Sequence, residues 1–242
     1  MWPFKKLFTT PPYAPTITDV QIILPELQPH RKSEHSMAWL TPEGEAIQIG
    51  LFPPCSWPFP LQQQNNDLFK DEALKKRMFD YWQTQAQVKQ GAVVEVRPLK
   101  IQGIPALQGI FKYHVPDSLA LIYIGIIWLP FKNFLYQINI EAVEHGTTGM
   151  REAVVNTLER NQGKWPEQQE PEMLDTMEAL LEKLKQTALQ RTLSDDENYD
   201  AMFPHHPLTR VRDILSQLPV YIQLSAQLCK QPVYDFNSPP EG

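Results

Sequence analysis

Proline is the residue that most restricts what this chain can fold into. The sequence contains 23 prolines, and eleven of them lie within the first 60 residues. Each proline fixes its own φ angle, lacks a backbone donor and favours extended geometry in the residue before it. Helix is therefore not expected in this region. The pattern predicts short strands at residues 19–24, 36–40 and 45–51, with a turn over 41–44 between the last two.

The middle of the chain reads as one helix followed by four strands. Apolar residues at helical spacing predict a helix over 71–88, with capping side chains at 65–67 and a stop at Gly91. Extended patterns then predict strands at 92–97, 106–115, 119–129 and 134–142. The strand at 119–129 is apolar on both faces, which is typical of a central strand covered by helices.

After residue 147 the hydrophobic period is helical. Thr148 would cap a helix that ends before Gly163, and a second helix would occupy 171–188. A last helical region would start at Pro207, break near Pro219 and resume to Cys229.

The order of these elements predicts an α+β fold, in which an antiparallel β-sheet is flanked by helices as an α/β/α sandwich. We expect three parts in the chain: a Pro-rich N-terminal arm at 1–17, an α+β sheet domain at 18–165, and a C-terminal helical extension at 166–242 packed on that domain.

One family resemblance covers about residues 18–160. The expected helix at 71–88, the strand over 93–96, the turn Gly103-Ile104-Pro105-Ala106, the paired strands and the helix after Gly146 together resemble the PsbP/DcrB-like family. The resemblance implies a non-enzymatic antiparallel α/β/α module that binds other proteins, and some relatives are similar to chaperones encoded beside type VI secretion effectors. It assigns no binding residue. The lipobox and transit peptide of exported relatives are missing here, so we expect the intracellular branch.

Composition narrows the classes of function. Hydrophobic residues make up 42% and charged residues 21%, which is typical of a folded protein. A net charge of −6 disfavours a nucleic-acid partner. The apolar stretch 118–131 is uncharged, but it is shorter than the ~20 apolar residues of a spanning helix and contains Pro130. Two cysteines far apart give neither a disulfide framework nor a zinc motif. We therefore expect a cytoplasmic protein without a membrane span or cofactor.

The segment 195–206 is the one part of the chain that is rich in metal-ligand residue types. These residues are Asp195, Asp196, Glu197, Asp200, His205 and His206. Their spacing matches neither His-Glu-x-x-His nor an EF-hand loop, and a solvated acidic loop between two helices is the simpler interpretation. The loop 145–151 could hold an anion at a helix start, but capping by Thr148 also explains it. We therefore predict no catalytic residue and no bound metal.

Aromatic residues near prolines are the best candidates for partner binding. Trp57 and Phe59 lie in the proline-stiffened segment 53–60, and Trp128 and Phe131 flank Pro130. Rigid aromatic side chains in ordered loops are common anchors of protein interfaces. We predict that these four residues bind a partner; the alternative is that they fold back over the sheet.

The sequence thus favours a non-enzymatic cytoplasmic module that binds another protein. In its most concrete form, the prediction is a chaperone, adaptor or immunity protein for a bacterial toxin or secreted effector. Two alternatives stay open: a metal-dependent hydrolase centred on 195–206, and a structural subunit of a larger assembly. The partner and the oligomeric state are not predicted.

Overall fold

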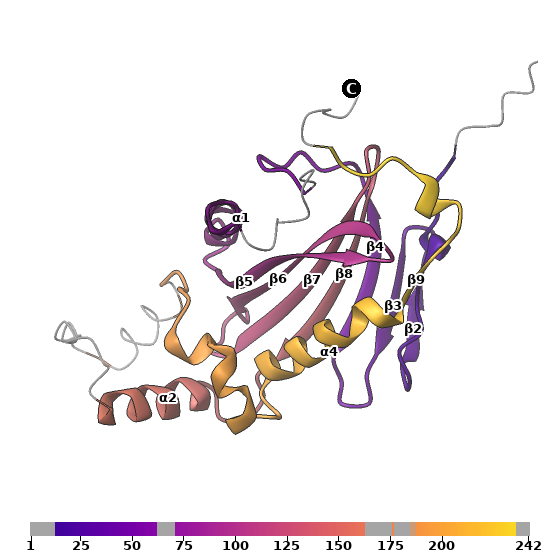
Figure 1. The fold of residues 1–242 in the computed structure, drawn as a ribbon. Helices are drawn as coiled ribbons and strands as arrows, with labels where there is room; N and C mark the ends of the chain where they lie inside the picture. Colours follow the sequence, from indigo (N-terminus) through magenta and orange to yellow (C-terminus); the bar gives the residue numbers. More distant parts are fainter. Residues whose placement is uncertain (1–12, 62–70, 163–175, 177–184, 186, 236–242) are drawn as a thin grey trace, which may run out of the picture.

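A computed structural model of the chain describes residues 13–61, 71–162, 176, 185 and 187–235. Its centre is a seven-stranded sheet in the order β2-β3-β4-β8-β7-β6-β5, and every neighbouring pair is antiparallel. Helix α1 packs on one face of this sheet, and helix α4 runs across the other (Figure 1). A separate ladder of two short strands, β1 and β9, lies beside it.

The elements have the following bounds. The strands are β1 Val20–Ile22, β2 Gln28–Lys32, β3 Ser36–Leu40, β4 Ala46–Phe52, β5 Ala92–Ile101, β6 Ile104–His114, β7 Leu121–Pro130, β8 Leu135–Val143 and β9 Ile222–Leu224. The helices are α1 Glu72–Gln87, α2 Met150–Asn161 and α4 Pro207–Tyr221, with single 3₁₀ segments η1 Ile17–Asp19, η2 Leu193–Asp195, η3 Glu197–Met202 and η4 Leu228–Lys230.

The predicted fold class is confirmed: the chain is α+β, with a large antiparallel sheet on which helices pack. Strand β7 lies between β8 and β6, as its apolar pattern on both faces predicted. Helix α1 begins where the sequence places it, because the Asp71 carboxylate accepts a hydrogen bond from the Leu74 amide at 3.0 Å.

The contact between α4 and the sheet depends on one glycine. Leu208, Val211 and Leu215 of α4 are buried against the sheet face at β7 and β8. A Cβ atom on Gly125 of β7 would lie 2.7 Å from Val211 Cγ1 and 2.8 Å from Leu215 Cδ1. Glycine at this position therefore lets the helix approach the strand closely.

The C-terminal prediction was wrong in one respect. The chain was expected to resume helix after Pro219, but α4 continues through this proline to Tyr221 and then turns into strand β9. Strand β9 pairs with β1, so that Val20 lies opposite Leu224. A tertiary pairing with the start of the chain thus overrides the local helical pattern. The C-terminal residues contribute to the same core as the sheet.

Two further predictions differ from the structure, and two cannot be compared with it. Thr148 does not cap α2; Gly149 does, in the left-handed region at φ 71°, where glycine is favoured. Strand β2 was not predicted, because its five residues are all exposed and include a proline. The capping residues 65–67 lie outside the described residues, and so does most of the helix predicted over 171–188. Within the described ranges, no helix has the length and apolar character needed to cross a membrane.

Candidate functional site

The four aromatic residues predicted to bind a partner are all buried. Trp57 is 6% exposed, Trp128 3%, and Phe59 and Phe131 0%. Trp57, Phe59 and Trp128 lie together on the α1 face of the sheet, whereas Phe131 belongs to the core on the other face. The structure therefore shows the alternative arrangement, in which these side chains fold back over the sheet. They offer no open surface to a partner.

The aromatic cluster under α1 is a packed core. Trp82 of α1 stacks on Trp128 with ring centroids 4.3 Å apart, and Trp57 meets both rings edge-on. The Tyr234 hydroxyl donates a hydrogen bond to the Trp57 carbonyl at 2.7 Å. Burial raises the pKa of the nearby Cys55 thiol to about 12, so this cysteine is not an activated nucleophile. The geometry indicates packing and not chemistry.

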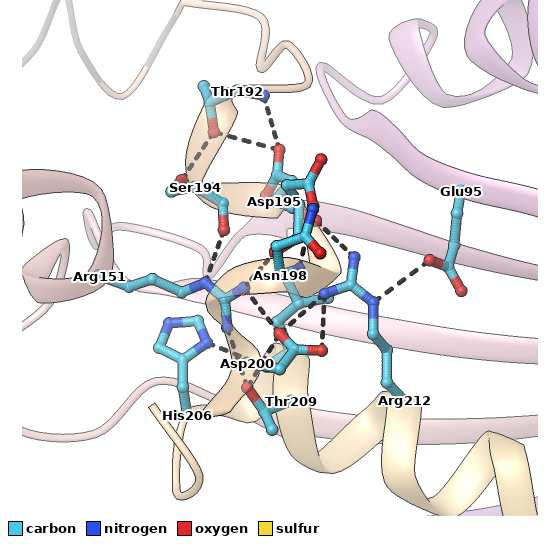
Figure 2. A network of polar contacts seen from close by, with 12 residues as sticks. Glu95, Arg151, Thr192, Ser194, Asp195, Asn198, Asp200, His206, Thr209 and Arg212 are labelled. Carbon is cyan, nitrogen blue, oxygen red and sulfur yellow. Dashed lines mark hydrogen bonds and ion pairs between the residues drawn. The ribbon is translucent and has the colours of Figure 1, made fainter. Parts of the chain in front are cut away.

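The acidic segment 195–206 is not the solvated loop that the sequence suggested. Asp195 is completely buried, and its Oδ2 lies 2.6 Å from the Lys112 ammonium, which β6 supplies from the sheet. The same carboxylate oxygen accepts a hydrogen bond from the Thr192 amide at 2.7 Å. Figure 2 shows that the segment lies within a network of polar contacts. Because buried charges need partners, these contacts fix the segment in place.

Arg151 of α2 is the centre of this network, with a side chain that is fully buried. Its guanidinium donates to the Ser194 carbonyl at 2.6 Å and to the Thr209 hydroxyl at 2.9 Å. It also donates to the Asp196 carbonyl at 3.0 Å and to Asp200 Oδ1 at 2.7 Å. One arginine thus binds η2, η3 and the start of α4 to α2.

Arg212 of α4 completes the network on the other side. Its guanidinium contacts both oxygens of Asp200, at 2.9 and 3.1 Å, and donates to Glu95 of β5 at 3.2 Å. It also donates to the Asp195 carbonyl. We call Lys112, Arg151, Asp195, Asp200 and Arg212 the ionic network. Three cations from β6, α2 and α4 hold the segment through these contacts.

Two further metal-type residues of the segment, Asp196 and His206, act as helix caps. Asp196 accepts a hydrogen bond from the Asn198 amide and so caps η3. The His206 ring caps α4 through Nδ1, which accepts from the Leu208 amide at 3.2 Å, and its Nε2 lies 3.3 Å from Glu144. Among the described residues, no three His, Cys, Asp or Glu side chains converge as metal ligands would. The geometry gives no support to the hydrolase alternative.

A groove lies between residues 24–27, the turn 42–45 and helix α4, with a volume of about 390 Å³. We call it the acidic groove. Its apolar lining consists of Leu24, Leu27, Ile214 and Tyr221, together with prolines. Its charged lining consists of Glu26, Glu43, Glu45, Asp213 and Arg210. Four carboxylates thus share this groove with a single guanidinium.

The charges of the acidic groove are unevenly compensated. Arg210 forms an ion pair with the buried Glu45 and lies 3.7 Å from Glu43. The Thr41 hydroxyl also donates to Glu45. Burial, followed by the charge of Asp200, raises the pKa of Asp213. Burial is the larger of these two causes, and within the described residues no cation forms an ion pair with Asp213. The groove is therefore suited to a ligand that brings both apolar and positively charged groups.

Sequence reasoning missed both the ionic network and the acidic groove. Arg212 carried one usable signal, because it lies beside Val211 in the apolar stripe of α4, where a charge needs a buried partner. Lys112 carried the same signal between Phe111 and Tyr113 of β6. The groove had no such signal, since its walls come from residues about 190 positions apart.

Comparison with known proteins does not assign this chain to a family. No protein-family model matches this chain, and no curated protein does. A solved structure of a mutant of the protein Mog1 is similar to it, at 7% sequence identity over 85% of this chain and 90% of that one, with a TM-score of 0.42. At this TM-score the likeness carries no argument, so the fold class rests on the chain's own sheet and helices.

Proposed function

We propose that this chain is a non-enzymatic module that binds another protein and acts by covering part of its partner's surface. The observation that carries the proposal is the acidic groove, which combines an apolar lining with an excess of carboxylates. Interface sites of this kind bind through apolar contact and take their specificity from charge. The docking surface proposed here replaces the four aromatic residues, because those are buried.

In its most specific form, the proposal is a cytoplasmic chaperone, adaptor or immunity protein for a bacterial toxin or secreted effector. The support for this part is the resemblance to the PsbP/DcrB-like family over residues 18–160. The mechanism is steric: the partner's segment occupies the groove, and the rest of the domain shields the adjoining surface.

Site-specific photo-crosslinking tests the proposal. A photoreactive amino acid replaces Gln217, which lines the acidic groove, and in a control chain it replaces Gln85, an exposed residue of α1 on the other face of the sheet. After irradiation in the native host, mass spectrometry identifies the adduct, and the purified partner is titrated against the purified chain by calorimetry. We expect a partner that crosslinks at position 217 and not at 85, and that binds saturably.

Two results would contradict the proposal. One is equal crosslinking at both positions, followed by no saturable binding of the purified protein. The other is a saturable heat on titration with a divalent cation that disappears in His205→Ala, an exposed position, since this would support the hydrolase alternative.

A further inference from the structure

Two exposed apolar residues lie next to the lining of the acidic groove. Ile23 and Val220 are 51% and 82% exposed, and each is the chain neighbour of a lining residue, Leu24 or Tyr221. The Ile23 amide donates to the Tyr221 carbonyl at 2.9 Å, which holds these two stretches side by side. Large exposed apolar residues next to a groove are typical of a surface that a partner covers.

Three carboxylates of the acidic groove, which we call its rim, are accessible to a cation of a ligand. Glu26, Glu43 and Asp213 are exposed, and Glu26 and Asp213 form no ion pair within the described residues. Arg210 is engaged by Glu45. Within the described residues, the carboxylates of Glu26 and Asp213 can therefore pair with a cation that a ligand brings. The rim therefore attracts Lys or Arg side chains and repels acidic ones.

A second depression adjoins the acidic groove and lengthens the site. It has a volume of about 260 Å³ and shares Glu43, Glu45 and Arg210 with the groove. Beyond these it is lined by residues that include His145 and His205. The ion pair between Arg210 and Glu45 forms the boundary between the two. The carboxylates of the second depression are the two that it shares with the groove, so a bound segment that crosses this boundary passes from carboxylates to histidines.

From this combination we infer that the acidic groove binds a basic, apolar segment of the protein partner. Its apolar side chains lie on Leu24, Leu27 and Ile214, and its Lys or Arg side chains lie against the carboxylates of the rim. The inference rests on the proposed function and names the chemistry of the segment that the site selects.

Two short labelled peptides of equal length test this selectivity by fluorescence anisotropy, one of alternating leucine and lysine, the other of alternating leucine and glutamate. We expect only the lysine peptide to bind. The double variant Glu43→Gln/Asp213→Asn should weaken its binding about tenfold, as expected for the loss of two rim charges. Ile214→Ser should also weaken it. The matched control is Glu72→Gln/Asp80→Asn, which removes the same charge from exposed residues of α1; here the Kd should change less than about twofold.

The outcomes separate this inference from the proposed function. Equal losses of affinity in the two double variants would mean general attraction to a negatively charged chain, and would overturn the inference. A partner that crosslinks at position 217, but whose Kd is unchanged by Glu43→Gln/Asp213→Asn, would also overturn it while the proposed function stands. Saturable binding of the lysine peptide at the groove, without any protein partner in the crosslinking experiment, would support the selectivity of the groove for basic, apolar segments. It would contradict the proposed function, and with it the inference that the segment belongs to a protein partner.

Discussion

The two faces of the sheet are held to their helices in different ways. On the α1 face, Trp57, Trp82 and Trp128 pack ring against ring. On the α4 face, a core of mainly aliphatic side chains, which also contains Phe131 and Tyr136, continues into the ionic network around Arg151. The first face depends on the shapes of its side chains, whereas the second depends on every buried charge having its partner. The two faces should therefore respond differently to the loss of one residue.

The physical reason is the cost of an unpaired charge. Removing an aromatic ring leaves a cavity, and its cost is limited because the surrounding side chains can partly relax. Removing one member of a buried ion pair leaves the other charge desolvated without compensation. Asp200 contacts both Arg151 and Arg212, so the loss of either arginine also disturbs the contacts of the other.

The largest expected effect comes from breaking the ionic network at its centre. Arg151→Ala removes the donor to Ser194, Asp196, Asp200 and Thr209. We expect the free energy of unfolding, measured by urea denaturation, to fall by about 4–5 kcal/mol. Two carbonyls and the Thr209 hydroxyl lose their donor, and the partly buried Asp200 keeps only Arg212 as its cation. The control Lys76→Ala breaks an exposed pair and should cost less than about 0.5 kcal/mol. A loss below about 1 kcal/mol in Arg151→Ala would refute the central role of this residue.

The second-largest effect is expected on the α1 face of the sheet. Trp128→Ala removes the ring that stacks on Trp82 and should cost about 3–4 kcal/mol in the same measurement. Because the Trp128→Ala substitution leaves no charge without a partner, the loss of stability should be the same at low and high salt. Trp128→Phe should recover part of this loss. A strong dependence of the loss on salt would contradict the contrast between the two faces.

A smaller effect is expected where α4 meets the sheet. Gly125→Ala places a methyl group against Val211 and Leu215, so the helix must shift outward. Overpacking of this kind costs about 1–3 kcal/mol. Gly44→Ala is the comparison, since no atom lies near its added Cβ, although its backbone at φ 98° is strained for alanine. Hydrogen exchange of the α4 backbone amides should be faster in Gly125→Ala but not in Gly44→Ala. An unchanged exchange rate in Gly125→Ala would mean that the close contact does not restrain α4.

The smallest effect depends on pH. Burial raises the pKa of Asp19, but hydrogen bonds from the Ser225 hydroxyl and the Thr16 amide outweigh it, so this pKa lies below its ordinary value. The stability that Asp19 contributes is present above its unfolded-state pKa and is lost as pH falls through the lower, folded-state pKa. Asp19→Asn should therefore cost about 1 kcal/mol near neutral pH and progressively less in acid. A loss that stays constant with pH would exclude the ionised carboxylate as its source.

The sequence could predict what depends on neighbouring residues. The expected helix at 71–88 and strand at 134–142 agree with α1 and β8 to within one residue at each end, because their hydrophobic periods are local. Strand β2 could not be predicted, since an edge strand that is exposed on all sides carries no alternation. The sequence singled out Trp57 and Trp128 as partner-binding residues, and their burial could not be predicted, because rigid aromatic side chains occur in cores and in interfaces alike. The ionic network depends on partners that are distant in sequence, such as Lys112 and Asp195.

The ladder between β1 and β9 joins residues about two hundred positions apart in the chain. At translation rates of about 5–20 residues per second, β1 leaves the peptidyl-transferase centre roughly 10–40 s before its partner strand is made. Helix α4, which packs on one face of the sheet chiefly through β7 and β8, is also completed only just before β9. Throughout synthesis of the preceding strands, that apolar face has no covering helix. Chains truncated before residue 207 should consequently aggregate, and productive folding of this protein is an event that follows translation.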